Sequence, residues 1–164
     1  MTSNLRINYN SFKIKKMKII CTETRSKNLD LRDVTMVLNH SYDFKNDGLI
    51  IDQEYLVMGI KSHMESSYLY YLIDTQSWHP DWFPSTLFDI IDNTFPPFWH
   101  LKLFDDKQQE ELRFLMGYEE LCGDSNYYYR LVEGEKEASQ LYYRKKIELE
   151  NYYNEYIDGN QFFR

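Results

Sequence analysis

The four histidines are the first candidates for acid–base or metal chemistry, because imidazole titrates near neutral pH and binds metal ions readily. They are His40, His63, His79 and His100. None stands at the HxH, HxxxH or HExxH spacing that brings two imidazoles to one metal ion. His79 and Asp81 flank a proline and could share a metal, but two ligands do not make a site. We therefore expect turn or surface histidines and no metal or other cofactor.

Carboxylates and nucleophiles give no clearer signal for catalysis. The acidic residues form runs such as Glu119–Glu120 and 133–137, which are typical of solvated helix faces. A glycosidase needs two carboxylates facing each other across a cleft, and no pair stands out. The chain has no G-x-S-x-G, P-loop or GxGxxG motif, and Cys122 would need a nearby histidine to act as a nucleophile. We expect a protein that is not an enzyme, with a small carboxylate-based hydrolase as the least favoured alternative.

Aromatic side chains near predicted turns indicate binding instead. The stretch WHPDWFPSTLFDIID, residues 78–92, contains Trp78 and Trp82, and a further tryptophan follows at Trp99. Aromatic anchors with acidic surroundings suit the capture of a peptide or protein. In the alternative interpretation Trp82 and Phe83 cap the hydrophobic core, which would leave Trp78 in its polar turn as the aromatic contact.

The net charge of −7 is unevenly distributed along the chain. Residues 1–16 carry four basic and no acidic side chains, so acidic residues exceed basic ones in the remainder. Such a surface repels phosphate backbones and attracts basic partners, so we expect a protein partner and no nucleic acid. The candidate partner contacts are Trp78, Asp81, Trp82, Glu133, Glu135 and Glu137.

Cysteine use and hydropathy predict a cytoplasmic protein. Cys21 and Cys122 follow no CxxC or Cys/His pattern, and two reduced thiols are favoured over one long-range disulfide. No apolar run reaches the roughly 18 residues that span a bilayer. The basic N-terminus lacks the apolar stretch and cleavage site of a signal peptide, so we expect no membrane association.

The elements that must position these residues change character along the chain. Residues 1–16 predict a flexible basic extension, and residues 17–104 a β-rich unit. The predicted strands cover residues 17–22, 34–38, 49–60 with a polar turn at Asp52–Gln53, 68–74, 82–83 and 87–91. The run YLYYLID at 68–74 predicts a central strand. Residues 61–67 predict a polar hairpin loop, and Pro96–Pro97 predicts the end of the β region.

Helical patterns dominate the predicted third segment, residues 105–164. Asp105 and Asp106 each precede a glutamine by three residues, which predicts a capped helix ending at Gly117. A short helix is expected after Asp124, ending near Gly134. A long helix is expected over 135–156, and its apolar stripe predicts packing on the β-rich unit.

A family resemblance rests on LIIDQEYLVMGI, YLYYLID and WFPSTLFDIID, followed by GYEEL and LVEGE in the C-terminal part. Together these motifs resemble small bacterial Src-homology-3-like barrel proteins, several of which look like immunity proteins of polymorphic toxin systems. The resemblance implies an α+β fold, with a five-stranded β-barrel followed by a C-terminal helical segment. It implies neutralisation of a basic toxin domain by steric occlusion. A peptide-binding adaptor is the alternative, although the acidic loop and ALYDY opening of peptide-binding Src-homology-3 domains are missing.

Overall fold

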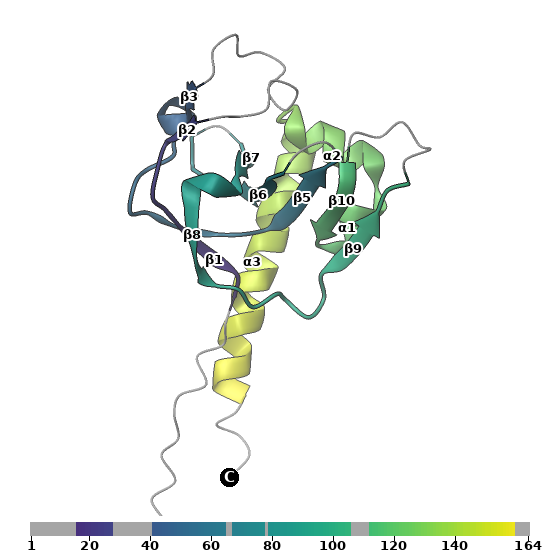
Figure 1. Ribbon diagram of the computed structural model, residues 1–164. Helices are drawn as coiled ribbons and strands as arrows, with labels where there is room; N and C mark the ends of the chain where they lie inside the picture. The colour runs from purple at the N-terminus through teal and green to yellow at the C-terminus, as the bar shows by residue number, and fades with distance from the viewer. Residues whose placement is uncertain (1–15, 28–40, 65–66, 78, 106–111, 160–164) are drawn as a thin grey trace, which may run out of the picture.

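The computed structural model describes residues 16–27, 41–64, 67–77, 79–105 and 112–159, and within them strands precede helices (Figure 1). The strands are β1 Lys18–Cys21, β2 Arg25–Lys27, β3 Ser41–Asp43, β4 Glu54–Leu56, β5 Gly59–His63, β6 Leu69–Ile73, β7 Asp81–Pro84, β8 Phe88–Asp92, β9 His100–Leu103 and β10 Leu112–Gly117. The helices are the 3-10 turns η1 Phe44–Asp47 and η2 Ser85–Leu87, then α1 Glu119–Gly123, α2 Ser125–Val132 and α3 Lys136–Gly159. The predicted α+β class, with helices after strands, is confirmed.

The strands form two larger antiparallel sheets. Five strands follow the order β7-β6-β5-β10-β9, and three follow the order β4-β1-β8. A short ladder joins β2 to β3. Both larger sheets are open within the described residues. The strands there form two sheets, and a closed five-stranded barrel is not seen among them.

The five-stranded sheet is covered on both faces, because successive side chains of a strand point to opposite sides. On β6, Tyr70 and Leu72 face a helix-side core, whereas Tyr71 and Ile73 face a strand-side core. The helix-side core contains buried residues of all three α-helices, and the strand-side core contains β1 and β4 residues. This double burial explains the continuous apolar run of β6, and the prediction of a central strand there is confirmed.

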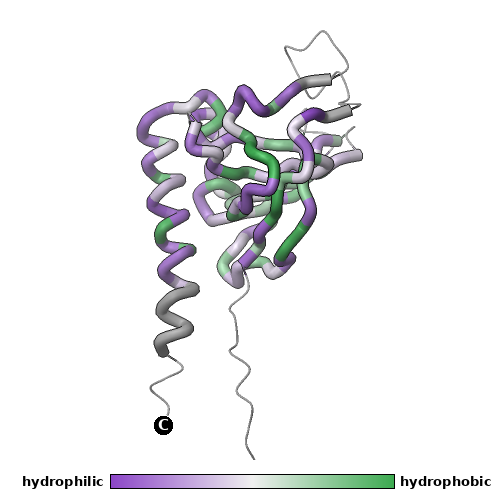
Figure 2. Tube along the Cα trace, turned by 90° about the vertical axis from the view of Figure 1, so that its left-hand side faces the viewer, coloured by the Kyte–Doolittle hydropathy of each residue, from purple (hydrophilic) through white to green (hydrophobic). Residues whose placement is uncertain are grey.

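Local capping explains the positions of α2 and α3. The Asp124 side chain accepts a hydrogen bond from the Asn126 backbone N–H at 2.9 Å, as expected of an N-cap residue. Gly134 separates the two helices with a positive φ of 70°, a conformation that favours glycine. On α3, Ala138, Tyr142 and Leu149 are buried in the helix-side core, and the helix runs along one side of the sheets (Figures 1 and 2). The two predicted helices are confirmed.

Residues 112–117 correct the predicted helix that ends at Gly117. They form β10, which pairs with β5 on one side and with β9 on the other. Leu112 and Leu115 fit a helical spacing, but the strand places Leu115 in the helix-side core and Phe114 against the strand-side core. Pairing on both edges outweighs the weak local preference. Consequently Pro96–Pro97 does not end the β region.

Further expectations concern a loop, a strand, the N-terminal extension and the two cysteines. The predicted loop at 61–67 is wrong at its start, because β5 continues through Lys61 to His63. The predicted strand at 34–38 and nearly all of the predicted extension at 1–16 lie outside the described residues. Cys21 and Cys122 are both free and buried, and they belong to different cores, in agreement with the expectation of two thiols.

Two facing glycines allow α1 to approach the five-stranded sheet closely. Gly59 of β5 pairs with Gly117 of β10. A methyl group added at either position would lie 2.7 Å from Cδ2 of Leu121, which α1 presents to the sheet. Leu121 is 1% exposed. Because neither glycine has a side chain, the Leu121 side chain can pack directly on the backbone of β5 and β10.

Two buried tyrosines of the helix-side core should respond oppositely to loss of their hydroxyl. The Tyr127 hydroxyl lies 2.6 Å from that of Tyr118 and donates to the Ala138 carbonyl at 3.2 Å. The Tyr142 hydroxyl is buried without a hydrogen-bond partner among the described residues. We expect Tyr127→Phe to lower the free energy of unfolding by about 1–3 kcal/mol and Tyr142→Phe to raise it by about 1 kcal/mol, since an unpaired buried hydroxyl is costly. Urea denaturation of both variants checks this, and a loss in both would show that Tyr142 is bonded.

Candidate partner-binding surface

Two segments chosen from the sequence as candidate contacts lie side by side. The segment at residues 79–81 leads into β7, which begins at Asp81, and the turn between α2 and α3 contains Gly134. A methyl group added at Gly134 would lie only 2.6 Å from Cδ2 of His79. The His79 Nδ1 atom lies 3.0 Å from the Pro80 carbonyl oxygen, so the ring is held by its own segment as well. The structure thus brings the neighbourhood of Asp81 next to that of Glu133 and Glu135.

Asp81 is half-buried at the start of β7. Burial raises the pKa of its carboxyl group, because desolvation disfavours the charged form. A hydrogen bond from the Trp82 backbone N–H to Asp81 Oδ1, at 2.7 Å, and the charges of His79 and Lys61 act in the opposite direction on this pKa. Asp81 is therefore held by the fold and offers only part of its carboxylate to a partner.

Replacement of Asp81 by asparagine should stabilise the fold at neutral pH. The raised pKa means that ionisation costs more free energy in the folded state than in the unfolded state. This cost is absent where both states are protonated, below the ordinary value of 3.8, and is complete above the folded-state pKa. Asparagine keeps an acceptor oxygen for Trp82, so we expect Asp81→Asn to melt at a higher temperature than the parent, with a larger difference at pH 7 than at pH 4. Calorimetry at both pH values checks this, and an equal difference would rule out the charge as its cause.

Trp82 belongs to the helix-side core, which places it in the position predicted by the core-capping alternative. It is 9% exposed, and its Nε1 has no hydrogen-bond partner among the described residues. The Lys61 Nζ atom lies 5.0 Å from the Trp82 ring centroid and donates to the Tyr128 hydroxyl at 3.0 Å. Buried cations are stabilised by such aromatic faces. Trp82 therefore acts mainly in joining β7 to β5 and α2.

Three candidate glutamates lie on the surface. Glu133 is the C-cap residue after α2, Glu135 follows Gly134, and Glu137 lies in the first turn of α3. All three are exposed. Trp78 lies outside the described residues. Among the described candidate contacts, these glutamates are the charged residues that are exposed, whereas Asp81 is half-buried.

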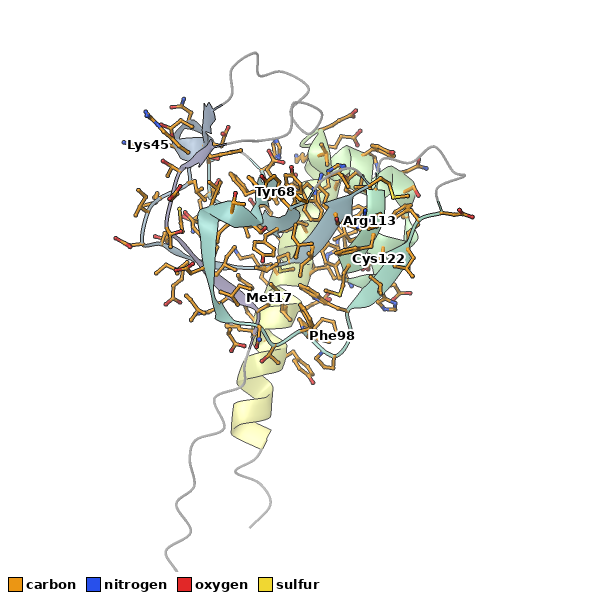
Figure 3. The ribbon with its side chains drawn as sticks, in the orientation of Figure 1. Met17, Lys45, Tyr68, Phe98, Arg113 and Cys122 are labelled. Carbon is orange, nitrogen blue, oxygen red and sulfur yellow. The ribbon has the colours of Figure 1, made fainter. Side chains whose placement is uncertain are left out.

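Sequence reasoning did not predict a pocket of about 320 Å³ between α1, α3 and the segment before β9. Four aromatic residues contribute to its wall, namely Phe98, Trp99, Tyr118 and Tyr152. Figure 3 shows Phe98 on the segment between β8 and β9, and its ring contacts that of Tyr152 edge to face at 5.4 Å. The apolar stretch after Pro97 was a usable signal, because it had to pack on something, but its partner on α3 is more than forty residues away in the sequence.

The described ranges show neither a metal centre nor an activated thiol. No group of three or more His, Cys, Asp or Glu residues there could hold a metal ion. Burial raises the pKa of the Cys122 thiol to about 11, which keeps it protonated at neutral pH. None of the helices in the described ranges is long and apolar enough to cross a membrane.

A scan against protein-family models and searches of curated proteins and of solved structures found no match for this chain.

Proposed function

We propose that the protein is a non-enzymatic binding protein of the immunity type, which neutralises a basic toxin domain by steric occlusion. The observation that carries the proposal is the exposed acidic group Glu133, Glu135 and Glu137 around a single turn. The chain as a whole has a net charge of −7. Acidic surfaces accelerate association with basic proteins, because opposite charges steer the encounter.

The backbone supports the proposal by holding the acidic turn in one conformation. Glu133 N–H donates to the Tyr129 carbonyl at 2.9 Å, and Glu135 N–H donates to the Arg130 carbonyl at the same distance. Gly134 N–H donates to the Leu131 carbonyl at 3.1 Å. A preorganised surface loses less conformational entropy on binding than a flexible loop. The turn is therefore suited to a tight complex.

We also propose that the strands follow the plan of a Src-homology-3-like barrel. Strands β4 and β5 are nearly continuous in sequence but belong to different sheets. Strand β4 pairs with β1 in the three-stranded sheet, and β5 pairs with β6 in the five-stranded sheet. The 3-10 turn η2 connects β7 to β8, and β8 returns to pair with β1. This connectivity supports a bent, two-sheet barrel to which β9 and β10 add an extension. Solution of an experimental structure with a bound partner would test it.

We further propose a cytoplasmic location, which the two free, buried thiols support, because disulfides are rare in that compartment.

The functional proposal is tested with the gene that lies beside the one encoding this chain. We expect that gene to encode a basic domain that arrests bacterial growth when expressed alone. Co-expression of this chain should restore growth, and the two purified proteins should form a stable complex in gel filtration. A neighbouring protein that is harmless, or toxic but not relieved, would contradict the immunity assignment. A complex formed with a harmless neighbour would favour the peptide-binding adaptor instead.

A further inference from the structure

We infer that the aromatic pocket between Phe98, Trp99, Tyr118 and Tyr152 binds an arginine side chain presented by the basic partner. The inference rests on the proposed function, because the partner supplies the arginine. The volume of about 320 Å³ falls at the lower end of the range of about 300–1,000 Å³ for small-molecule sites. It suits one long side chain better than a whole folded element.

The wall of the pocket is aromatic and comes from three separate elements. Phe98 and Trp99 precede β9, Tyr118 directly precedes α1, and Tyr152 lies on α3. The Phe98 and Tyr152 rings meet at an interplanar angle of 84°, so they present a corner rather than a flat stack. Aromatic faces carry negative partial charge and attract cations. The wall therefore favours a flat cation over an anion.

The charged residues at the rim of the pocket also favour a cation. Glu119, Glu148 and Lys145 line the pocket. The Lys145 Nζ atom lies 2.8 Å from Glu120 Oε1 and 3.2 Å from Glu148 Oε2, so two carboxylates already engage the one ammonium group. Glu120 does not line the pocket, so Glu119 and Glu148 are the two lining carboxylates beside the one ammonium group. The pocket is thus surrounded by more negative than positive charge, and its fixed acceptors match a donor cation.

Arginine satisfies both conditions better than other side chains. Its guanidinium group is planar and stacks on aromatic rings, and its donors can bind a carboxylate in pairs. A lysine ammonium has the charge but not the planar face. An acidic or neutral side chain would leave the Glu119 carboxylate desolvated without a partner.

The position of the pocket on α3 links it to the acidic turn. Glu137 and Glu148 are eleven residues apart, which is about three turns of an α-helix, so they lie on the same face about 16 Å apart. A protein of ordinary size that contacts the acidic turn can therefore reach the pocket along this face. An arginine seated in the pocket would anchor the complex at one end while the glutamates steer the other.

The test titrates the purified full chain with N-acetyl-arginine amide and follows the Trp99 indole signal by NMR. The chain has three tryptophans, so a Trp99→Phe variant assigns that signal. N-acetyl-citrulline amide is the control, because it has nearly the same shape without the charge, and N-acetyl-lysine amide tests the planar group. We expect a saturable shift with the arginine probe and at least tenfold weaker binding of the other two.

A pair of matched variants locates the binding site. Glu119→Gln should weaken binding of the arginine probe about fivefold to tenfold, because it removes a rim carboxylate that forms no ion pair within the described ranges. Glu23→Gln makes the same change in net charge at an exposed residue of the β-rich part and should leave probe binding unchanged. Thermal melts confirm that both variants are folded.

Three results would overturn the assignment: no saturable shift at 50 mM probe, an equal response to citrulline, or equal weakening in the two variants. A failed titration beside successful relief of a toxin would overturn the pocket alone. Binding of the arginine probe without relief of any toxin would overturn the proposed function alone.

Discussion

Replacing Leu121 by alanine is expected to lower the free energy of unfolding by about 2–5 kcal/mol, the range found for buried leucines. Leu121 is 1% exposed, and it fills the space above the paired glycines Gly59 and Gly117. Removing its side chain leaves a cavity between α1 and the five-stranded sheet. Urea denaturation of the variant measures the loss, and Ile147→Ala, which shortens an exposed residue of α3, should change stability by less than about 0.5 kcal/mol.

The same contact gives the prediction a second, independent check. Gly117→Ala should cost about 1–3 kcal/mol, because the new methyl group overlaps Leu121 and also lies 3.0 Å from the Met58 carbonyl oxygen. In the double variant with Leu121→Ala the overlap with the leucine is gone. We expect the double variant to lose at least about 1 kcal/mol less unfolding free energy than the sum of the losses in the two single variants. Strict additivity would show that α1 does not pack on these glycines.

Reversing the charge of Glu133 and Glu135 to lysine should slow association with the basic partner about 10–100-fold at low ionic strength. Both side chains are exposed, and neither carboxylate has an ion-pair partner among the described residues. Like charges now face each other at the first encounter. Stopped-flow measurement of the association rate at several salt concentrations checks the effect, which should shrink at high salt because ions screen exposed charges.

A control variant with the same net charge separates local steering from the overall field. Glu23 and Asp89 are exposed residues of the β-rich part, more than forty residues before the acidic turn in the sequence. We expect their reversal to lysine to reduce the association rate less than threefold. An equal reduction in both double variants would mean that net charge alone, and not the acidic turn, guides the partner.

Local patterns predicted those parts of the fold in which short-range chemistry decides the structure. Asp124 and Gly134 marked the ends of α2 correctly, and the apolar run of β6 indicated burial on two faces. Residues 112–117 could not be predicted in this way, because their strand depends on pairing with β5, about fifty residues earlier. The same holds for Lys61, whose burial requires Trp82 and Tyr128 from distant parts of the chain.

The candidate site also has features that local sequence predicts and features that depend on distant contacts. Exposure of Glu133, Glu135 and Glu137 followed from an acidic run between two helices, which is a local property. The position of Trp82 depended on which face of β7 meets the helices, and the sequence left that choice open. The aromatic pocket combines residues from 58 to 152, so no sequence window contained it.

The two free thiols have a practical consequence. Cys21 lies in the strand-side core and Cys122 in the helix-side core, and both are shielded from solvent. A thiol reagent can reach each sulfur only when its own core opens. Labelling kinetics followed by mass spectrometry would therefore time the opening of the two cores separately. Matching rates would mean that the molecule opens as one cooperative unit, and a faster Cys122 would mean that the helices leave the sheet first.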